Sequence, residues 1–227
     1  MNIARILAGG TGTRLGAELP KQYLEVEGRP IIAYCLQTLE EHPEIDGIQV
    51  VAEVEWHSLI REWCGQKLRG FSQPGKNRQL SILSGLEDIR KYASEEDVVL
   101  IHDAARPLVS KQMITACLAG CKVHDGVMPA LPMKDTVYYG TEGRIEGLLE
   151  RSRVIAGQAP EAFVFGKYYE ANKTLLPQKI LEINGSTEPA LLAGMDVCYI
   201  PGDENNFKIT TKEDLERFSR IVVKEVE

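Results

Sequence analysis

The chain has 227 residues, of which 44% are apolar and 26% charged, ordinary proportions for a globular protein that buries a sizeable core. Its net charge is −7, so its surface as a whole does not attract nucleic acid or an anionic membrane, and an anionic ligand needs a local cationic pocket. No run approaches the ~20 apolar residues of a membrane helix, and the first residues do not read as a signal peptide.

Short runs rich in valine and isoleucine alternate along the chain with longer stretches of helical period. The runs predicted to be strands are Ile3–Leu7, Ile48–Ala52, Val98–His102, Gly126–Ala130 and Val197–Ile200. The stretches predicted to be helices are Pro30–Leu39, Asn77–Tyr92, Ser110–Cys121 and Thr211–Val223. Because the strands are apolar without interruption, this alternation predicts an α/β fold with a mostly parallel sheet flanked by helices.

One region breaks the alternation. Thr136–Tyr139 and Ile145–Leu149 flank the sequence GTEGR, a pattern typical of a β-hairpin with a glycine turn. An exposed hairpin needs a cover, and a partner subunit is favoured here over the edge of the chain's own sheet. Since no repeat or linker interrupts the sequence, we expect a single domain, 1–227, with an arm at about 133–151.

The cysteines are scattered and form no CxxC pair. They are Cys35, Cys64, Cys117, Cys121 and Cys198. We interpret all five as reduced and mostly buried small hydrophobic residues, and this pattern favours a reducing cytoplasm as the setting.

The first predicted strand leads into a glycine-rich stretch, ILAGGTGTRLGAELPKQYL. The Rossmann fingerprint fails here because Leu15 stands where its third glycine is needed, and the P-loop fails because no Gly-Lys pair occurs in this region. These failures disfavour a hydride-transfer enzyme and a classical NTPase. What remains is a glycine backbone able to face an anion, with Arg14 and Lys21 as cations. A tight turn with two solvated cations is the alternative.

Two further stretches add cations. PGKNRQLSILSGL places a glycine turn before a helix that carries Arg78 and Ser81 on one face of its first turns. NNFKITTKEDL presents Lys208 away from the neighbouring apolar side chains. Alone, each has a structural explanation, as a capped helix with a surface arginine or as a solvated lysine.

The stretch VVLIHDAARPL ends a strongly apolar strand at His102 and Asp103, followed by Arg106. Ligands of open α/β sheets bind beyond the carboxyl ends of the strands. We interpret His102 as a structural histidine. Asp103 points to function, because packing does not explain a carboxylate at a sheet edge, and Arg106 is suited to positioning a phosphate.

Seven motifs, in order, carry a resemblance over nearly the whole chain: LAGGTGTRLG, PKQYL, PGKNRQLSILSGL, HDAARP, MKDTV, AGQAPEAF and NNFKITTKEDL. Together they resemble the family of cytidylyltransferases that make CDP-activated sugar alcohols, the 2-C-methyl-D-erythritol 4-phosphate and ribitol-5-phosphate cytidylyltransferases. The resemblance implies a Rossmann-like nucleotidyltransferase fold and a homodimer joined through a protruding β-hairpin arm. It also implies CTP and a sugar-alcohol phosphate as substrates, with Mg²⁺ as the metal.

Matching positions give the site residues that the resemblance implies. The nucleotide-binding residues are Ala8, Gly9, Gly10, Gly12, Gly75, Arg78 and Ser81. The catalytic cations around the reacting phosphorus are Arg14, Lys21 and Lys208. The acceptor-binding residues are Asp103, Arg106, Thr136 and Arg151, the last two reaching the acceptor phosphate from the partner's arm. Asp103 is also the candidate metal ligand.

The implied reaction suits the residues at hand. An oxygen of the acceptor phosphate attacks the α-phosphorus of CTP, and pyrophosphate leaves. A phosphate monoester is a good nucleophile at neutral pH, so the reaction needs no Ser-His pair, and we find none. It needs two polyanions brought together and the developing charge neutralised, which cations and a metal do.

The chain departs from the family pattern at three places. Lys76 replaces an acidic residue, Ala159-Pro160-Glu161 replaces Thr-Pro-Gln, and Thr187-Glu188-Pro189 replaces Thr-Asp-Asp. The nucleotide half of the site therefore looks intact and the acceptor half altered. Methylerythritol phosphate is the favoured acceptor, with ribitol or another pentitol phosphate as the alternative.

Two other functions remain open at this point. One is a nucleotidyltransferase that uses a different base. The other, of another class, is a non-catalytic nucleotide-binding module, which the retention of Arg14, Lys21 and Lys208 disfavours because cations gathered around one phosphorus serve transfer more than binding.

Overall fold

The computed structural model describes residues 1–10 and 19–226. The strands are β1 (Asn2–Leu7), β2 (Glu25–Val26), β3 (Arg29–Pro30), β4 (Gly47–Val51), β5 (Leu68–Ser72), β6 (Val98–Asp103), β7 (Gly126–Pro132), β8 (Tyr138–Thr141), β9 (Arg144–Leu148), β10 (Ile155–Gly157), β11 (Glu161–Val164) and β12 (Val197–Pro201). The α-helices are α1 (Ile31–Glu40), α2 (His57–Trp63), α3 (Arg78–Ile89), α4 (Lys111–Gly120), α5 (Phe165–Lys173), α6 (Glu188–Leu192) and α7 (Lys212–Val226).

The central sheet is mixed but mostly parallel, in the order β10-β7-β11-β6-β1-β4-β5, with β12 paired to β7. Parallel pairing joins β1 to both β4 and β6, β4 to β5, and β7 to β12. β11 is antiparallel to β6 and β7, and β10 is antiparallel to β7. The predicted α/β class is confirmed, and each of the five predicted strands is present. The two antiparallel strands of the central sheet, β10 and β11, were not predicted.

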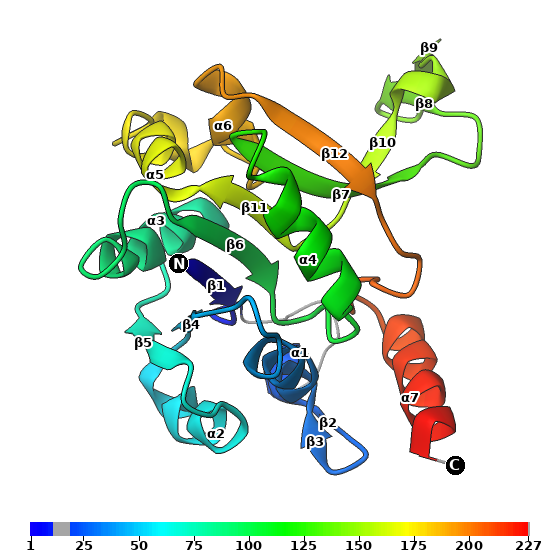
Figure 1. The fold of residues 1–227 in the computed structure, drawn as a ribbon. Helices are drawn as coiled ribbons and strands as arrows, with labels where there is room; N and C mark the ends of the chain where they lie inside the picture. Colours follow the sequence, from blue (N-terminus) through cyan, green and yellow to red (C-terminus); the bar gives the residue numbers. More distant parts are fainter. Residues whose placement is uncertain (11–18, 227) are drawn as a thin grey trace.

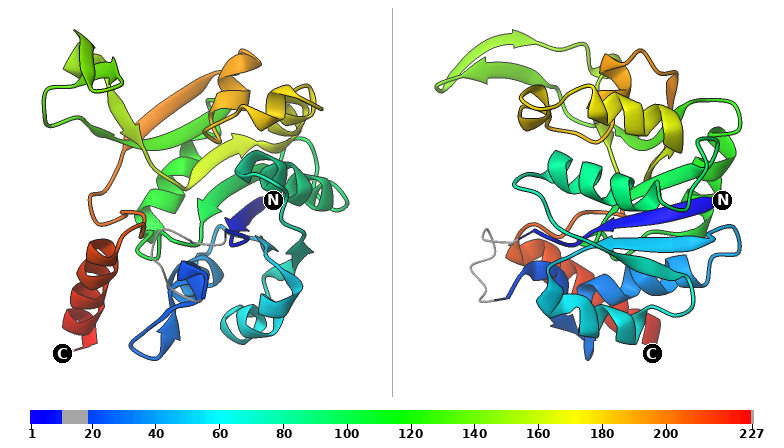
Figure 2. Two further views of the ribbon diagram at one scale, coloured as in Figure 1. Left: turned by 180° about the vertical axis from the view of Figure 1, so that it is seen from behind. Right: turned by 90° about the vertical axis from the view of Figure 1, so that its left-hand side faces the viewer.

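Helices cover the sheet on both faces (Figures 1 and 2). Alternate residues of β1 point to opposite sides, because side chains in a strand alternate. Ala4 and Ile6 pack with residues of α1, α2 and α4, whereas Ile3 packs with residues of α3 and α5. A third apolar cluster joins α7 to β2 and to the start of α1, around Phe218 and Val26. The four predicted helices correspond to α1, α3, α4 and α7.

The predicted hairpin is present as β8 and β9. Its turn residues Glu142 and Gly143 both have positive φ, 50° and 79°, the geometry that a two-residue hairpin turn requires and that glycine adopts most easily. Figure 2 shows the hairpin standing off the body of the protein as an arm. Its exposed apolar side chains include Tyr138, Tyr139, Ile145 and Leu148. Among the described residues, no helix combines the length and apolar character needed to cross a membrane.

Candidate active site

A cavity of about 660 Å³ opens beyond the carboxyl ends of β1, β5 and β6, within the usual size range of small-ligand sites. The predicted site residues that line it are Gly9, Gly10, Lys21, Gly75, Arg78, Ser81, Asp103 and Lys208. Gly12 and Arg14 lie outside the described residues. Strands β1 and β6 are parallel neighbours, with Leu7 opposite Asp103, so the segments that follow them leave the sheet on the same side. This edge of the sheet gathers motifs that lie far apart in the sequence.

The glycine segment after β1 is held from beneath by the two residues that follow Lys21. The Gln22 side chain is buried, and its Nε2 donates to the carbonyl oxygens of Ala8 and Gly10, both at 2.7 Å. The Tyr23 hydroxyl donates to the Ala8 carbonyl at 3.0 Å. Because these carbonyls are turned toward Gln22 and Tyr23, Ala8 supports the wall of the cavity rather than lining it. Sequence reasoning assigned no role to Gln22.

The opposite wall is the turn that leads into α3. Asn77 caps this helix, its Oδ1 accepting from the backbone N–H of Leu80 at 2.7 Å. The Ser81 hydroxyl accepts from the backbone N–H of Gly75 at 2.9 Å and so fixes the turn to the helix. A Cβ on Gly75 would lie 2.6 Å from the Leu80 carbonyl carbon, and such a contact is too close for any residue but glycine. The geometry of this turn therefore explains why glycine stands at position 75 and serine at position 81.

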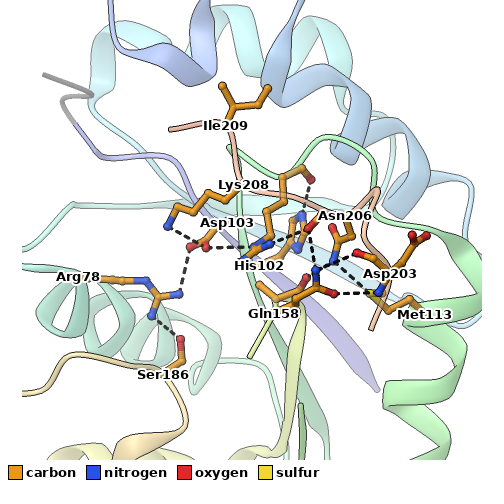
Figure 3. Close-up of polar contacts among 12 residues, drawn as sticks. Arg78, His102, Asp103, Met113, Gln158, Ser186, Asp203, Asn206, Lys208 and Ile209 are labelled. Carbon is orange, nitrogen blue, oxygen red and sulfur yellow. Dashed lines mark hydrogen bonds and ion pairs between the residues drawn. The ribbon is translucent and has the colours of Figure 1, made fainter. Parts of the chain in front are cut away.

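Asp103 lies between three cations at the base of the cavity (Figure 3). Its Oδ1 is 3.1 Å from Arg78 Nη2, and its Oδ2 is 3.0 Å from Lys208 Nζ and 3.8 Å from Arg106 Nε. Arg78 comes from α3, whereas Lys208 comes from the segment after β12. The Asp103 carboxylate thus brings together one residue from each predicted group: Arg78 from the nucleotide-binding residues, Lys208 from the catalytic ones and Arg106 from the acceptor-binding ones.

The charge state of Asp103 follows from this arrangement. Its side chain is 10% exposed, and burial by itself would raise the pKa of the carboxyl. Arg78 and Lys208 outweigh the burial and hold the pKa of Asp103 well below its usual range. Asp103 is therefore ionised at neutral pH, and the cluster of three cations and one anion has a net positive charge suited to an anionic ligand.

Arg106 is fixed at both ends of the residue. Its Nη1 donates to the Asn206 carbonyl at 2.6 Å, and its own carbonyl accepts from His102 Nε2 at 2.9 Å. Burial lowers the pKa of His102 to about 4, so this imidazole is neutral at pH 7 and has only a positioning contact. The structure therefore agrees with the interpretation of His102 as structural.

Buried amides hold the segment that supplies Lys208. Gln158 Nε2 donates to the Asp203 carbonyl at 2.8 Å, and Asn206 Nδ2 donates to the Ala159 carbonyl at 2.7 Å. These contacts tie the segment after β12 to the segment between β10 and β11 (Figure 3). Lys21 joins the same segment from the other side, its Nζ donating to the Ile209 carbonyl at 2.6 Å.

Asp103 does not fit the predicted role of a metal ligand by itself. Both of its oxygens are within 3.1 Å of a cationic nitrogen, so a metal ion would have to compete with Arg78 and Lys208 for this carboxylate. Nor does the described part of the chain gather three carboxylate, histidine or cysteine side chains into a group able to hold one. We therefore derive no catalytic step through a protein-bound metal.

Thr136 and Arg151 are not brought to this cavity. Thr136 is exposed before β8. Arg151 is also exposed, donates to the Lys134 carbonyl at 2.9 Å, and lines a second cavity of about 790 Å³ beside the arm. Within one chain, these two predicted acceptor residues are separate from the Asp103 cluster. This placement is compatible with a role across a subunit interface.

Sequence reasoning assigned no role to two residues at the base of the site, although it noted Glu161 as a departure from the family pattern. Ser186 Oγ accepts a hydrogen bond from Arg78 Nη1, and Glu161 lies close enough to Arg78 and Asp103 to interact with both charges. Nothing in the spacing of the sequence connects Ser186 with Arg78. The only available signal was that both residues lie in or beside stretches that depart from the family pattern.

Comparisons with known proteins agree with this geometry. The family model of 2-C-methyl-D-erythritol 4-phosphate cytidylyltransferase, IspD, matches residues 3–224. A 2-C-methyl-D-erythritol 4-phosphate cytidylyltransferase of Geobacter metallireducens is 36% identical over 93% of this chain and 93% of its own. A ribitol-5-phosphate cytidylyltransferase of Lacticaseibacillus paracasei is 28% identical over 96% of each.

A solved structure extends the comparison to the fold. The 2-C-methyl-D-erythritol 4-phosphate cytidylyltransferase of Francisella tularensis superposes with a TM-score of 0.82 at 25% identity, over 95% of this chain and 97% of that one. The family model, the relative from Geobacter and the superposition all extend over nearly the whole chain. The chain belongs to the 2-C-methyl-D-erythritol 4-phosphate cytidylyltransferase family.

Proposed function

We propose that this chain transfers a cytidylyl group from CTP to 2-C-methyl-D-erythritol 4-phosphate and releases pyrophosphate. The observation that carries the proposal is the cavity in which Lys21, Arg78 and Lys208 meet beside a glycine backbone. Lys76 lines the same cavity, so a protein with a net charge of −7 concentrates four cations there, which suits a polyanionic substrate.

Each wall of the cavity has a separate task in this proposal. The backbone of Gly9 and Gly10, supported by Gln22, faces the triphosphate. Lys208 lies in the segment between β12 and α7, and Lys21 binds the same segment at the Ile209 carbonyl. In the proposed reaction both lysines neutralise charge at the α-phosphorus as the acceptor oxygen attacks. No side chain needs to remove a proton from the acceptor, because its phosphate oxygen is already ionised at neutral pH.

The acceptor is assigned on similarity. The family model and the relative at 36% identity both carry the name 2-C-methyl-D-erythritol 4-phosphate cytidylyltransferase. Ribitol-5-phosphate is the second candidate, since cytidylyltransferases named for it are 28% and 29% identical over nearly the whole chain. The two candidates share CTP chemistry and differ in the polyol that the acceptor half of the site must hold.

Three further parts of the proposal concern the setting. Mg²⁺ is the expected metal, carried by the phosphates of the nucleotide rather than by Asp103, because Mg²⁺ commonly binds substrate phosphates. A homodimer joined through the arm is expected from the exposed apolar side chains of β8 and β9. A cytoplasmic location, with neither nucleic acid nor membrane as partner, is supported by five free cysteines and the net negative charge.

The test is pyrophosphate release with CTP and Mg²⁺, run in parallel with 2-C-methyl-D-erythritol 4-phosphate and with ribitol 5-phosphate. We expect release with the first acceptor and much slower release with the second. Faster release with ribitol 5-phosphate would assign the alternative acceptor. Binding of CTP without release with either acceptor would favour a nucleotide-binding module and contradict the proposal.

Replacing Arg151 by alanine tests the role of the arm. If Arg151 contacts the acceptor phosphate across a dimer interface, Arg151→Ala will raise the KM for the acceptor at least ~10-fold and leave the KM for CTP nearly unchanged, as expected when one charged hydrogen bond is lost. Steady-state kinetics with each substrate varied in turn measures both constants. Arg153→Ala, on the same 3₁₀ turn, is the control. An effect confined to the KM for CTP would place Arg151 in the wrong site.

A further inference from the structure

Glu161 lies on the same face of the sheet as Asp103. It is the first residue of β11 and pairs with Ile101 of β6, two residues before Asp103. Because side chains two residues apart in a strand share a face, the two carboxylates are diagonal neighbours, about 7–8 Å apart at the backbone. The base of the site therefore holds two acidic groups under one set of cations.

The surroundings of Glu161 link it to Arg78. Its Oε2 is fully buried and accepts no hydrogen bond within the described residues. The Ser186 hydroxyl accepts a hydrogen bond from Arg78 Nη1 and lies close enough to the carboxyl of Glu161 to favour its ionised form. Ser186 is 1% exposed, so this contact is shielded from water. Ser186 thus connects Glu161 to an arginine that lines the cavity and holds Asp103.

Charged and titratable groups reach Glu161 from every side. They are Arg78 of α3, Asp103 of β6, Arg106 of the following segment, Tyr168 of α5 and, from the opposite face, Cys117 of α4. Burial, strengthened by Asp103, raises the pKa of Glu161 to about 7, although Arg78 and Ser186 act in the other direction. Glu161 therefore changes its charge near neutral pH, whereas Asp103 stays ionised.

We propose that Glu161 is a positioning residue for the acceptor half of the site. It sets the net charge around the predicted acceptor residues Asp103 and Arg106 and, through Ser186, orients Arg78, the predicted nucleotide-binding residue that also holds Asp103. Glu161 does not line the cavity, so it acts through these neighbours and not by touching the substrate. This inference rests on the proposed function only for the identity of the anion, since any phosphate held by Arg78 and Arg106 is affected in the same way.

The direction of the effect follows from the charges. When Glu161 is neutral, Arg78, Arg106 and Lys208 face one carboxylate, and the cluster attracts a phosphate more strongly. When Glu161 is ionised, two carboxylates compete with the phosphate for the same cations. Because proton binding and anion binding are linked, the acceptor binds better below the pKa of Glu161 than above it.

The experiment compares the wild-type protein with Glu161→Gln, which keeps the size of the side chain and fixes it as neutral. The KM for the acceptor and the KM for CTP are measured from about pH 6 to about pH 8, which spans the pKa of Glu161. The expected ratio of acceptor KM, wild type over variant, is about 1 at the acid end and rises ~5-fold at the alkaline end, equivalent to less than one pKa unit of coupling. Ionisation of the acceptor phosphate cancels in this ratio.

Two further variants distinguish the proposed positioning role of Glu161 from a purely structural one. Glu170→Gln makes the same change on an exposed residue of α5 and is expected to follow the wild type at every pH. Ser186→Ala removes the hydroxyl that favours the ionised form of Glu161, so it is expected to move the midpoint of the pH dependence upward. If Glu161→Gln fails to fold, the midpoint measured for Ser186→Ala tests the role of Glu161 instead. Coincident profiles for wild type and Glu161→Gln, or an unmoved midpoint in Ser186→Ala, would overturn the proposal.

Binding of inorganic phosphate, measured by calorimetry at the two ends of the pH range, keeps this inference apart from the proposed function. We expect the same pH-dependent ratio for the dissociation constant of phosphate. If the wild type releases no pyrophosphate with either acceptor but the phosphate ratio still rises, the proposed function fails and the role of Glu161 stands. If turnover is normal and the phosphate ratio is flat, the role of Glu161 fails and the proposed function stands.

Discussion

Lys21→Ala is expected to lower the turnover number at least ~100-fold, the usual effect of losing one electrostatic stabiliser of a transition state. Lys21 lines the cavity, and its Nζ is held 2.6 Å from the Ile209 carbonyl, next to the segment that carries Lys208. A cation so placed has little freedom to move, so under the proposed function its charge would be preorganised for the α-phosphorus. Turnover is measured as pyrophosphate release at saturating CTP and acceptor.

The fold is expected to survive this change. The alanine variant loses the hydrogen bond to the Ile209 carbonyl, and a hydrogen bond of this kind contributes about 1 kcal/mol to the free energy of unfolding. Circular dichroism and thermal unfolding check this, and Lys122→Ala, at an exposed lysine after α4, is the matched control. Near-normal turnover of a folded Lys21→Ala protein would contradict the role given to Lys21.

Asp103→Asn is expected to lower the free energy of unfolding by about 3 kcal/mol, which is the usual cost of removing one partner of a buried ion pair. Arg78, Arg106 and Lys208 would then lie together with no anion between them apart from Glu161. Because asparagine keeps the shape of the side chain, the decrease in the free energy of unfolding measures the effect of removing the charge. Chemical denaturation of both proteins at neutral pH measures the difference.

The pH dependence gives this prediction a sign. The pKa of Asp103 is lower in the folded protein than the ordinary value of about 4, so its stabilising effect is complete above about pH 4 and is lost as the pH falls further. The stability difference between wild type and Asp103→Asn should shrink in that acid range. Added inorganic phosphate should stabilise the variant more than the wild type, because it supplies the missing anion. Equal stability of the two proteins at neutral pH would show that the cations do not depend on Asp103.

The main elements of the fold are predictable because they carry a strong local signal. The apolar run of β6 and the capped, amphipathic pattern of α4 can each be recognised within a dozen residues of sequence. β11 does not, because its four residues, EAFV, are too few for a period and begin with a glutamate. Its antiparallel place between β6 and β7 depends on long-range pairing that no local pattern encodes.

The site divides in the same way. Asp103 was predictable because it ends a strand at the edge of the sheet where ligands bind. Arg78 and Lys208 were assigned only through the motifs that carry the family resemblance, since each alone had a structural explanation. Ser186 was not, because it reaches Arg78 from a segment 108 residues away that has no motif of its own. The shift in the pKa of Glu161 was equally hidden, because it arises from burial and from neighbours on other elements.

The cavity is closed by a segment that comes very late in the order of synthesis. Lys208 and Ile209 meet partners from the first half of the chain, Asp103 and Lys21, and the contact to Lys21 spans 188 residues. Contacts of such long sequence separation form only after the intervening chain has been made and ordered. While the ribosome still encloses this segment, the earlier strands can fold but the cation pocket is incomplete. A nascent chain is therefore expected to acquire its sheet before it acquires any capacity for cytidylyl transfer.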